Sequence, residues 1–347
     1  MTIQVGLIGF GLSGSVFHAP LISAVEGLNL KTIVTSSAAA KVKKDYPNVE
    51  IVLDVDTLLL QKEIDVVVIT SPNTTHYEYA KRAIKAGKHV VVEKPFTVTS
   101  AEADELIILA QKKEVILTVF QNRRWDNDFL TVRELLAANV LGTLATYEAH
   151  YDRFRPIVQD RWREKDLPGS GMLYDLGSHL IDQALTLFGL PQAVWADLRV
   201  EREGAEATDY FHILLSYDRF KVILHSGSLV RDAGLKFMLH GDKGSFIKSG
   251  LDCQEDQLKQ GILPGDLGWG EDHQENYGRL TTEIGGIIIR GTVETLPGQY
   301  EEFYKKLVQS IELGIGAPVL AEDARNTIRV IEHAMTSHQE QRTVKFS

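Results

Sequence analysis

The chain has 347 residues, 44% of them hydrophobic and 24% charged, which is the balance of a folded globular protein long enough for two domains. Its formal net charge of −10 argues against nucleic acid as the main partner, and no apolar run approaches the roughly 20 residues of a membrane-spanning helix. Cys253 is the only cysteine, which excludes an intrachain disulfide and a cysteine-rich metal cluster. With no basic leader at its start, the sequence predicts a cytoplasmic protein without a membrane partner.

The N-terminal part alternates β-rich apolar runs with helical patterns. Continuous apolar runs are typical of strands buried on both faces, and their alternation with helices predicts a parallel sheet. We therefore expect an α/β, doubly wound Rossmann domain over residues 1–121. Its expected strands are residues 3–8, 28–34, 49–52, 65–70, 89–92 and 115–120, with helices over 74–86 and 100–113.

After residue 121 the pattern changes, and we expect an α+β domain over residues 122–347 that binds substrate and forms oligomers. Apolar residues recur with period two, which predicts a large, mainly antiparallel sheet. Residues 251–291, rich in Gly, Asp and Glu, suggest a long excursion with little regular structure. The final helix can pack back on the first domain. The expected strands are residues 143–151, 194–199, 210–217, 220–226, 235–240 and 245–247, with helices over 133–140, 172–188 and near 300–311 and 324–335.

A glycine motif, GFGLSG, follows the first expected strand and precedes a helix. Gly9 permits the tight turn, Gly11 beside Phe10 lets the backbone approach a pyrophosphate, and Gly14 lets the helix pack close to the strand. A phosphate would then meet the free N–H groups of that helix. A glycine-rich turn without a ligand is the alternative, which the strand–turn–helix context disfavours.

The end of the second expected strand bears on the choice of dinucleotide. NAD sites usually offer Asp or Glu there to the ribose 2′-hydroxyl, but this strand is followed by Ser36 and Ser37 and then by Lys41. Hydroxyls and cations suit a 2′-phosphate, so the sequence favours NADP, with NAD as the other possibility. The alternative is that the lysines only form a solvated helix face.

Two further segments fall at the carboxyl ends of expected strands, where ligands of open α/β sheets bind. Ser71, Pro72 and Asn73 form a turn at the expected cofactor crevice, and the nearby His76 is more often structural than catalytic in such a position. Glu93 and Lys94 end the fifth strand, where a cation would lie beside the ligand.

A second group of ionisable residues lies on the helix expected over residues 172–188. Asp175, His179 and Asp182 have the spacing i, i+4 and i+7, which aligns them on one helix face. Histidine is well suited to exchange a proton near neutral pH. A satisfied His–Asp pair in the core is the alternative. A metal site is disfavoured because no further His or Cys cluster supports it, so we expect no metal.

Together these motifs resemble the glucose-fructose oxidoreductase/inositol dehydrogenase family (Gfo/Idh/MocA). The matching segments are GFGLSG at residues 9–14, SPNTTH at 71–76, GKHV at 87–90 with EKP at 93–95, and DLGSH at 175–179. Within the family, NRRWDNDF at 122–129, DRWRE at 160–164 and SFIK at 245–248 resemble the bacterial NADP-dependent scyllo-inositol 2-dehydrogenases.

The resemblance implies roles for three residues. Lys94 matches the catalytic lysine that hydrogen-bonds the reacting hydroxyl, His179 the residue that accepts its proton, and Asp175 the acid that orients substrate and lysine. It also implies that the bond between Lys94 and Pro95 is cis. Relatives pair through the open face of the antiparallel sheet, which implies a homodimer or homotetramer.

The implied function is the reversible, NADP-dependent oxidation of a ring hydroxyl of a cyclic polyol, scyllo-inositol first. A dehydrogenase or reductase of an aldose or another sugar derivative is the alternative, and a non-enzymatic dinucleotide-binding regulator is the third reading. The second domain offers donors and flat surfaces for a polyol, although each can equally serve an ion pair or packing. The candidate substrate-binding residues are Lys94, Arg123, Trp125, Arg153, Arg155, Trp162, Asp175 and His179.

Overall fold

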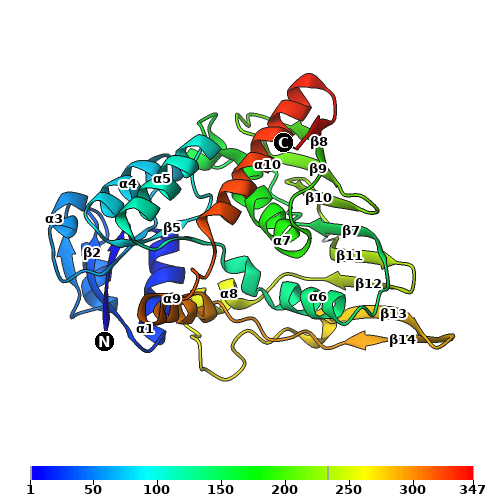
Figure 1. Ribbon diagram of the computed structural model, residues 1–347, viewed down its shortest axis with the longest axis horizontal. Coiled ribbons are helices and arrows are strands. Elements are labelled where there is room, and N and C mark those ends of the chain that lie inside the picture. Colours follow the sequence, from blue (N-terminus) through cyan, green and yellow to red (C-terminus); the bar gives the residue numbers. More distant parts are fainter. Residues whose placement is uncertain (1, 233, 347) are drawn as a thin grey trace. The chain divides into compact units, whose positions relative to one another are not determined.

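The computed structural model describes residues 2–232 and 234–346, which form two compact units (Figure 1). Unit 1 contains the chain up to Trp125 together with Gln254–Trp269 and Gln299–Arg325. Unit 2 contains Asp126–Cys253, Gly270–Gly298 and the chain from Asn326 on. In the described part of the chain, no helix combines the length and apolar character needed to cross a membrane.

Unit 1 includes more of the chain than the domain expected over residues 1–121. Two later segments that the sequence assigns to the second domain belong to unit 1. The reason is burial: Leu258, Phe303 and Leu307 from these segments share one apolar cluster with Val5 and Leu7 of the first strand. No local pattern in the sequence shows which of two cores such side chains will join.

The sheet of unit 1 is parallel with the strand order β3-β2-β1-β4-β5-β6, as a doubly wound fold requires. Successive side chains of a strand point to opposite faces. Val5 and Leu7 of β1 accordingly join one apolar cluster, while Ile8 joins another with Ala80 and Leu106. The strands are β1 (Ile3–Ile8), β2 (Leu28–Val34), β3 (Glu50–Val52), β4 (Val66–Ile69), β5 (His89–Glu93) and β6 (Leu117–Phe120).

Helices cover both faces of this sheet, since each cluster joins strands to helices. The helix α5 (Ser100–Lys113) begins with a capping box, in which the Thr99 side chain accepts from the Glu102 backbone N–H and the Glu102 side chain accepts in return. The other helices of unit 1 are α1 (Ala19–Ala24), α2 (Ala39–Asp45), α3 (Val55–Leu59), α4 (His76–Lys85), α8 (Gln254–Lys259) and α9 (Glu301–Leu313).

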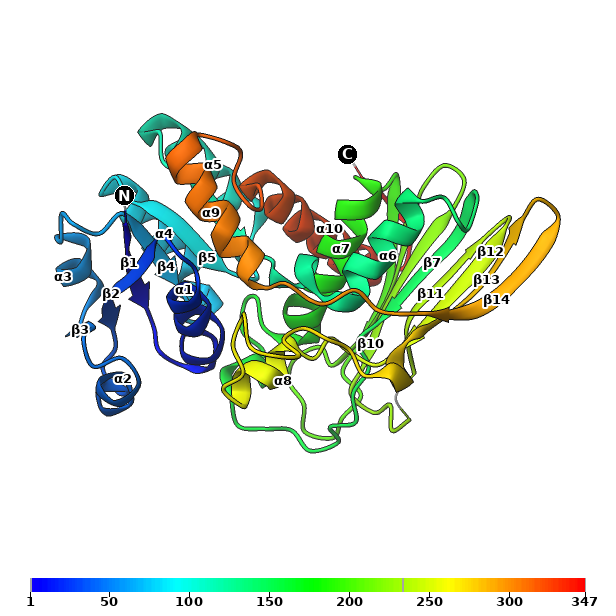
Figure 2. The ribbon, with the colours of Figure 1, turned by 90° about the horizontal axis from the view of Figure 1, so that it is seen from below.

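The sheet of unit 2 is mixed and mainly antiparallel, with the order β14-β13-β12-β11-β7-β10-β9-β8-β15; β7 and β10 pair in parallel. Figure 2 shows β7, β11, β12, β13 and β14 side by side. Its strands are β7 (Leu144–His150), β8 (Ala193–Arg199), β9 (Tyr210–Ser216), β10 (Lys221–Gly227), β11 (Leu235–Gly241), β12 (Gly244–Ser249), β13 (Gly278–Ile284), β14 (Ile287–Val293) and β15 (Val344–Lys345).

One face of this sheet is buried and the other is open, which explains the period-two pattern of the sequence. Tyr147 and Ala149 of β7 and Leu224 of β10 join the apolar cluster with Leu180 and Ile331 from helices. The residues between them are only partly buried. The helices of this layer are α6 (Asn127–Ala137), α7 (Ser178–Phe188) and the part of α10 (Ala321–Glu340) that belongs to unit 2.

The expectation of little regular structure over residues 251–291 is wrong. This segment contains α8, β13 and most of β14, and β13 pairs with β12. Gly278 suggests a loop from its local sequence, but it is the first residue of β13. A side chain could not be accommodated there, because a Cβ would lie 2.2 Å from the ring of Phe246. The glycine therefore serves close packing within the sheet and does not interrupt it.

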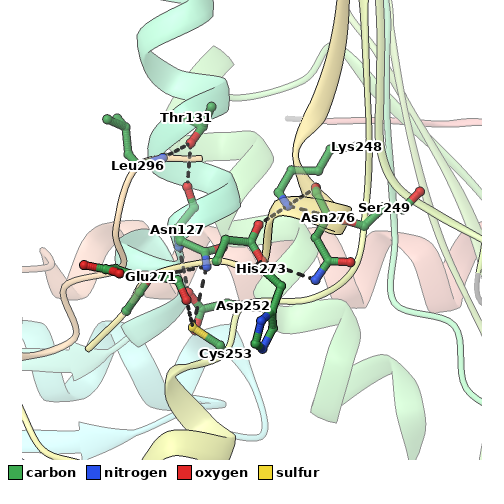
Figure 3. A network of polar contacts seen from close by, with 12 residues as sticks. Asn127, Thr131, Lys248, Ser249, Asp252, Cys253, Glu271, His273, Asn276 and Leu296 are labelled. Carbon is green, nitrogen blue, oxygen red and sulfur yellow. Dashed lines mark hydrogen bonds and ion pairs between the residues drawn. The ribbon is translucent and has the colours of Figure 1, made fainter. Parts of the chain in front are cut away.

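A buried ion pair anchors this segment to β12, and Figure 3 labels its Lys248 and the neighbouring Asn276. Lys248 Nζ lies 2.6 Å from Asp272 Oδ2 and also donates to the Asn276 carbonyl at 2.8 Å, with both charged side chains almost inaccessible to solvent. Nearby, the Asp252 carboxylate accepts from the Asn127 backbone N–H at 2.8 Å. Buried charges require such partners, so the network determines where the segment can lie.

Replacing Lys248 by Met should lower the free energy of unfolding by roughly 3–5 kcal/mol, because Asp272 would remain buried without its cation. Urea unfolding of the purified protein measures the change. Lys221→Met, at an exposed position of the same sheet, is the matched control and should change stability by less than about 0.5 kcal/mol. Equal stability of the two variants would contradict the anchoring role.

Candidate functional site

The glycine motif forms a tight turn between β1 and a helical segment. Gly9 has φ +95°, a conformation that side chains disfavour, and a Cβ at Gly14 would lie 2.3 Å from the Gly9 carbonyl oxygen. Ser13–His18 then forms a π-helical segment that continues into α1. Such segments are rare and are found frequently at functional sites.

Gly11 has a different environment. Apart from Gly11 itself and its two chain neighbours, no described residue has an atom within 4 Å of the position that a Cβ would take there, and the residue is exposed. The space beside the Gly11 backbone is therefore open to a ligand, as the approach of a pyrophosphate requires. The two glycines have separate roles: Gly14 serves packing, and Gly11 leaves room.

A cavity of ≈ 480 Å³ lies above this turn, a volume within the usual range of ligand sites. The cofactor-binding residues that the sequence predicts and that line it are Gly9, Phe10, Gly11, Ser36, Ser37 and Ser71. The cavity thus combines an open glycine backbone after β1 with hydroxyl groups after β2 and β4. The residues present fit a dinucleotide.

Lys41 and Arg82 bring positive charge to this part of unit 1. Lys41 Nζ lies 5.4 Å from the centre of the Phe10 ring and pairs with Asp45 at 2.6 Å. Arg82, which no sequence motif indicated, lines the cavity and forms an ion pair with Asp56. Since Arg82 lies on α4, far from the glycine motif in the sequence, only the packing of α4 indicates its position.

Glu93 at the end of β5 is a buried carboxylate held by several donors. Its Oε1 accepts from the Ser13 hydroxyl and lies 3.1 Å from His18 Nε2, and its Oε2 accepts from the Lys94 backbone N–H at 2.7 Å. Burial by itself raises the pKa of Glu93. The hydrogen bonds from His18 and Ser13 and the charges of His18 and Lys94 outweigh it and hold this pKa at about 2, so Glu93 is ionised.

Lys94 is half-buried directly after β5, and the Lys94–Pro95 peptide bond is cis, as the resemblance implies. His76 connects this turn to the one after β4. Its ring nitrogens lie 2.8 Å from the Pro95 carbonyl oxygen and 3.0 Å from the Ser71 carbonyl oxygen. Burial lowers the pKa of His76, which suits the structural role favoured for it. The neighbouring Pro72 and Asn73 precede α4, with Asn73 buried.

Asp175 and His179 lie in unit 2, on consecutive turns of one helical segment. Asp175 belongs to a π-helical stretch, Leu173–Gly177, which continues into α7 with His179 in its first turn. His179 is buried, whereas Asp175 is partly exposed and lies 3.7 Å from Arg163. Unit 2 therefore presents a carboxylate at a cavity wall with an imidazole one turn later.

Five arginines line the cavity that contains Asp175, against three carboxylates. Arg202 is committed to ion pairs with Glu164 at 2.5 Å and Asp209 at 2.8 Å. The predicted residues Arg153 and Arg155 line this cavity as well, and the Trp162 ring lies 5.3 Å from the Arg163 guanidinium. Arg161, Arg163 and Arg202 were not predicted as site residues, although all three belong to the charged segments around Trp162 and Asp209.

Arg123 and Trp125, predicted as substrate residues of the second domain, lie in unit 1. Arg123 pairs with Glu255 at 3.1 Å, and Trp125 packs edge-to-face on Phe303 with ring centres 6.0 Å apart. These contacts are the ion pair and the packing role that were the alternatives to substrate binding for these residues. Their substrate role stays a prediction.

Replacing Gly11 by Ala should weaken dinucleotide binding at least tenfold without unfolding the protein, because the methyl group would enter space that the chain leaves open. Fluorescence titration with NADPH and thermal unfolding measure the two effects. Gly14→Ala is the comparison: it should destabilise the protein itself, since its Cβ would overlap the Gly9 carbonyl. Unchanged dinucleotide affinity in Gly11→Ala would contradict the assignment.

The lowered pKa of Glu93 predicts a pH dependence of stability. The stability that ionised Glu93 contributes is complete above pH 4.5, the pKa of this side chain in the unfolded protein. This stability is lost by about 1.4 kcal/mol per pH unit as the pH falls from 4.5 toward the folded-state pKa of about 2. The stability difference between the wild-type protein and Glu93→Gln should therefore shrink below pH 4.5 in urea unfolding. Glu26→Gln, at an exposed position, is the matched control for the loss of a carboxylate.

Comparisons with known proteins agree with this architecture. Residues 3–121 match the family model of the oxidoreductase family with an NAD-binding Rossmann fold (GFO_IDH_MocA), and residues 133–346 match its C-terminal alpha/beta domain. The scyllo-inositol 2-dehydrogenase (NADP(+)) of Bacillus subtilis (strain 168) is 46% identical, over 99% of this chain and 96% of its own. The D-glucoside 3-dehydrogenase of Escherichia coli (strain K12) is 31% identical over 54% of this chain and 55% of its own.

A solved structure, that of the putative oxidoreductase yvaA from Bacillus subtilis, superposes with a TM-score of 0.97 at 46% identity and covers 100% of this chain and 99% of its own. With family matches over both parts of the sequence, the chain belongs to the Gfo/Idh/MocA family of oxidoreductases and is a dehydrogenase acting on CH–OH groups.

Proposed function

We propose that this protein oxidises a ring hydroxyl of a cyclic polyol, scyllo-inositol first, to the ketone with NADP as hydride acceptor, and that the reaction is reversible. The observation that carries the proposal is Lys94, a half-buried lysine at the carboxyl end of β5 whose backbone N–H donates to the ionised Glu93. The relative named scyllo-inositol 2-dehydrogenase (NADP(+)), similar over nearly the whole length of both chains, supports the substrate and the dinucleotide.

The proposed chemistry divides the work among three side chains. A bound nicotinamide would supply the acceptor for the hydride that leaves the carbinol carbon. The Lys94 ammonium hydrogen-bonds the reacting oxygen and stabilises the negative charge that develops on it. His179 accepts the hydroxyl proton, and Asp175 orients the substrate. The O–H and C–H bonds break as the C=O bond forms, and the reverse sequence reduces the ketone.

The preference for NADP is supported by the groups after β2. Ser36 and Ser37 line the cavity. Two carboxylates, Asp54 and Asp56, line it as well. Asp54 accepts from the Thr57 backbone N–H, and Asp56 forms an ion pair with Arg82. Hydroxyls with a neighbouring guanidinium suit a 2′-phosphate. NAD remains the alternative dinucleotide.

Ser37→Asp should weaken NADP binding at least tenfold and leave NAD binding within twofold, because a carboxylate would repel the 2′-phosphate. Ser37→Asn, which has nearly the same shape without the charge, is the matched control. Kd values for both dinucleotides measure the effect. Equal losses for NADP and NAD would contradict an NADP-specific role of this position.

Lys94→Met should lower kcat by about 100- to 1000-fold, the loss typical of removing one charge-stabilising donor, while the dinucleotide Kd stays within about twofold. This result separates an enzyme from the non-enzymatic regulator, which would bind dinucleotide without turnover in the wild-type protein. Reduction of NADP and NAD over inositol isomers, aldoses and sugar acids tests the substrate. Silence toward all of them would overturn the proposal.

A second candidate is a dehydrogenase of an aldose or another sugar derivative. The cavity of unit 2 favours it, since Arg153, Arg155 and Arg163 beside Asp175 would bind a substrate that carries a carboxylate. The relative named D-glucoside 3-dehydrogenase also acts on a sugar derivative by its name. Turnover of a sugar acid in preference to every inositol would select this candidate.

A further inference from the structure

Three potential metal ligands converge on the open face of the sheet of unit 2. His150 ends β7 and pairs in register with His225 on the parallel neighbour β10, and Asp152 follows β7 by two residues. The adjacent Tyr147, Ala149 and Leu224 are buried on the other face. In the single chain, the side chains of His150, His225 and Asp152 are 22%, 17% and 8% exposed.

The distances among these side chains suit a transition-metal ion. Asp152 Oδ2 lies 3.0 Å from His150 Nδ1, Asp152 Oδ1 lies 2.9 Å from His225 Nδ1, and ligand atoms of all three residues fall within 4.8 Å of one another. Ligands bonded at 2.0–2.2 Å in a tetrahedral site lie about 3.3 Å apart. Only small rotations of the side chains would then be needed.

We propose that His150, Asp152 and His225 form a binding site for a divalent transition-metal ion of the zinc type. Two imidazoles and one carboxylate are ligands for Zn²⁺ or Co²⁺, whereas Ca²⁺ and Mg²⁺ prefer oxygen alone. The set leaves one position for water. This site is independent of the proposed dehydrogenase reaction.

Surrounding contacts orient the ligands. Glu148 Oε1 lies 2.7 Å from His150 Nε2, so when that nitrogen donates to the carboxylate, Nδ1 is the ligand atom. The Asp152 carboxylate accepts from the Gly227 backbone N–H at 3.0 Å, and the rings of Tyr210 and His212 pack edge-on against His225. A carboxylate on the far nitrogen of a ligating histidine is a common outer contact of metal sites.

Charge also favours a cation. With neutral imidazoles the three ligands carry the single negative charge of Asp152, and Glu148 adds a second beside them. The same side chains can contact one another without a metal, as an imidazole–carboxylate network, and this is the alternative that the experiment must distinguish.

The test is a titration of EDTA-treated full-length protein with Co²⁺, followed by its visible d–d absorption, and then with Zn²⁺ as competitor. We expect one Co²⁺ per chain, displaced by Zn²⁺. His225→Gln and His150→Gln should each bind at least tenfold more weakly, and Zn²⁺ should raise the melting temperature of the wild-type protein more than that of either variant.

His212→Gln is the matched control, because His212 lies on the neighbouring strand β9 in register with His225 but outside the ligand group. Its metal affinity should stay within twofold of wild type. Circular dichroism checks that each variant is folded, and the two ligand variants test the site separately. Absence of Co²⁺ bands in the wild-type protein, or equal binding by wild type and both ligand variants, would overturn the proposal.

Discussion

The carboxylate of Glu93 is the constraint on which the candidate site of unit 1 depends. A charge buried at the end of a central strand is tolerated only when donors surround it, and Ser13, His18 and the Lys94 backbone N–H meet that need. Ser13 belongs to the glycine motif, so one buried ion connects the candidate phosphate-binding turn to the strand that carries the candidate catalytic lysine. His18 in turn contacts the Tyr304 hydroxyl, which ties α9 to the same cluster.

Among the described residues, two π-helical segments lie at candidate functional positions: one after the candidate dinucleotide turn and one in the helical segment of Asp175. One follows the glycine motif and contains Ser13 and His18, and the other contains Asp175 and leads into the turn with His179. A π turn is less favourable than an α turn, so its persistence requires support from surrounding packing. At both places a glycine, Gly14 or Gly177, removes a side chain from that crowded turn, next to Gly9 in the first case and Leu173 in the second.

The local charge around the cavity of unit 2 differs in sign from the total charge of the chain. The chain carries a formal net charge of −10, yet arginines outnumber carboxylates around the cavity of unit 2. Most of these cations are engaged: Arg202 holds Glu164 and Asp209, and Arg161 also holds Glu164 at 2.8 Å. The pairs preorganise the loop, so a polar substrate would meet fixed donors and not mobile side chains.

Local patterns in the sequence determined the elements and much of the candidate site. The apolar runs predicted the first and last residues of β1 and β2 correctly. This was possible because a strand buried on both faces is a continuous apolar run, which is visible in the local sequence. The glycine spacing indicated the turn after β1 for the same local reason. Tertiary structure alone decided that Gln254–Trp269 and Gln299–Arg325 join unit 1, that β13 and β14 extend the sheet, and that Arg82 lines the cavity. Those outcomes depend on packing between residues far apart in the chain, which local periodicity does not encode.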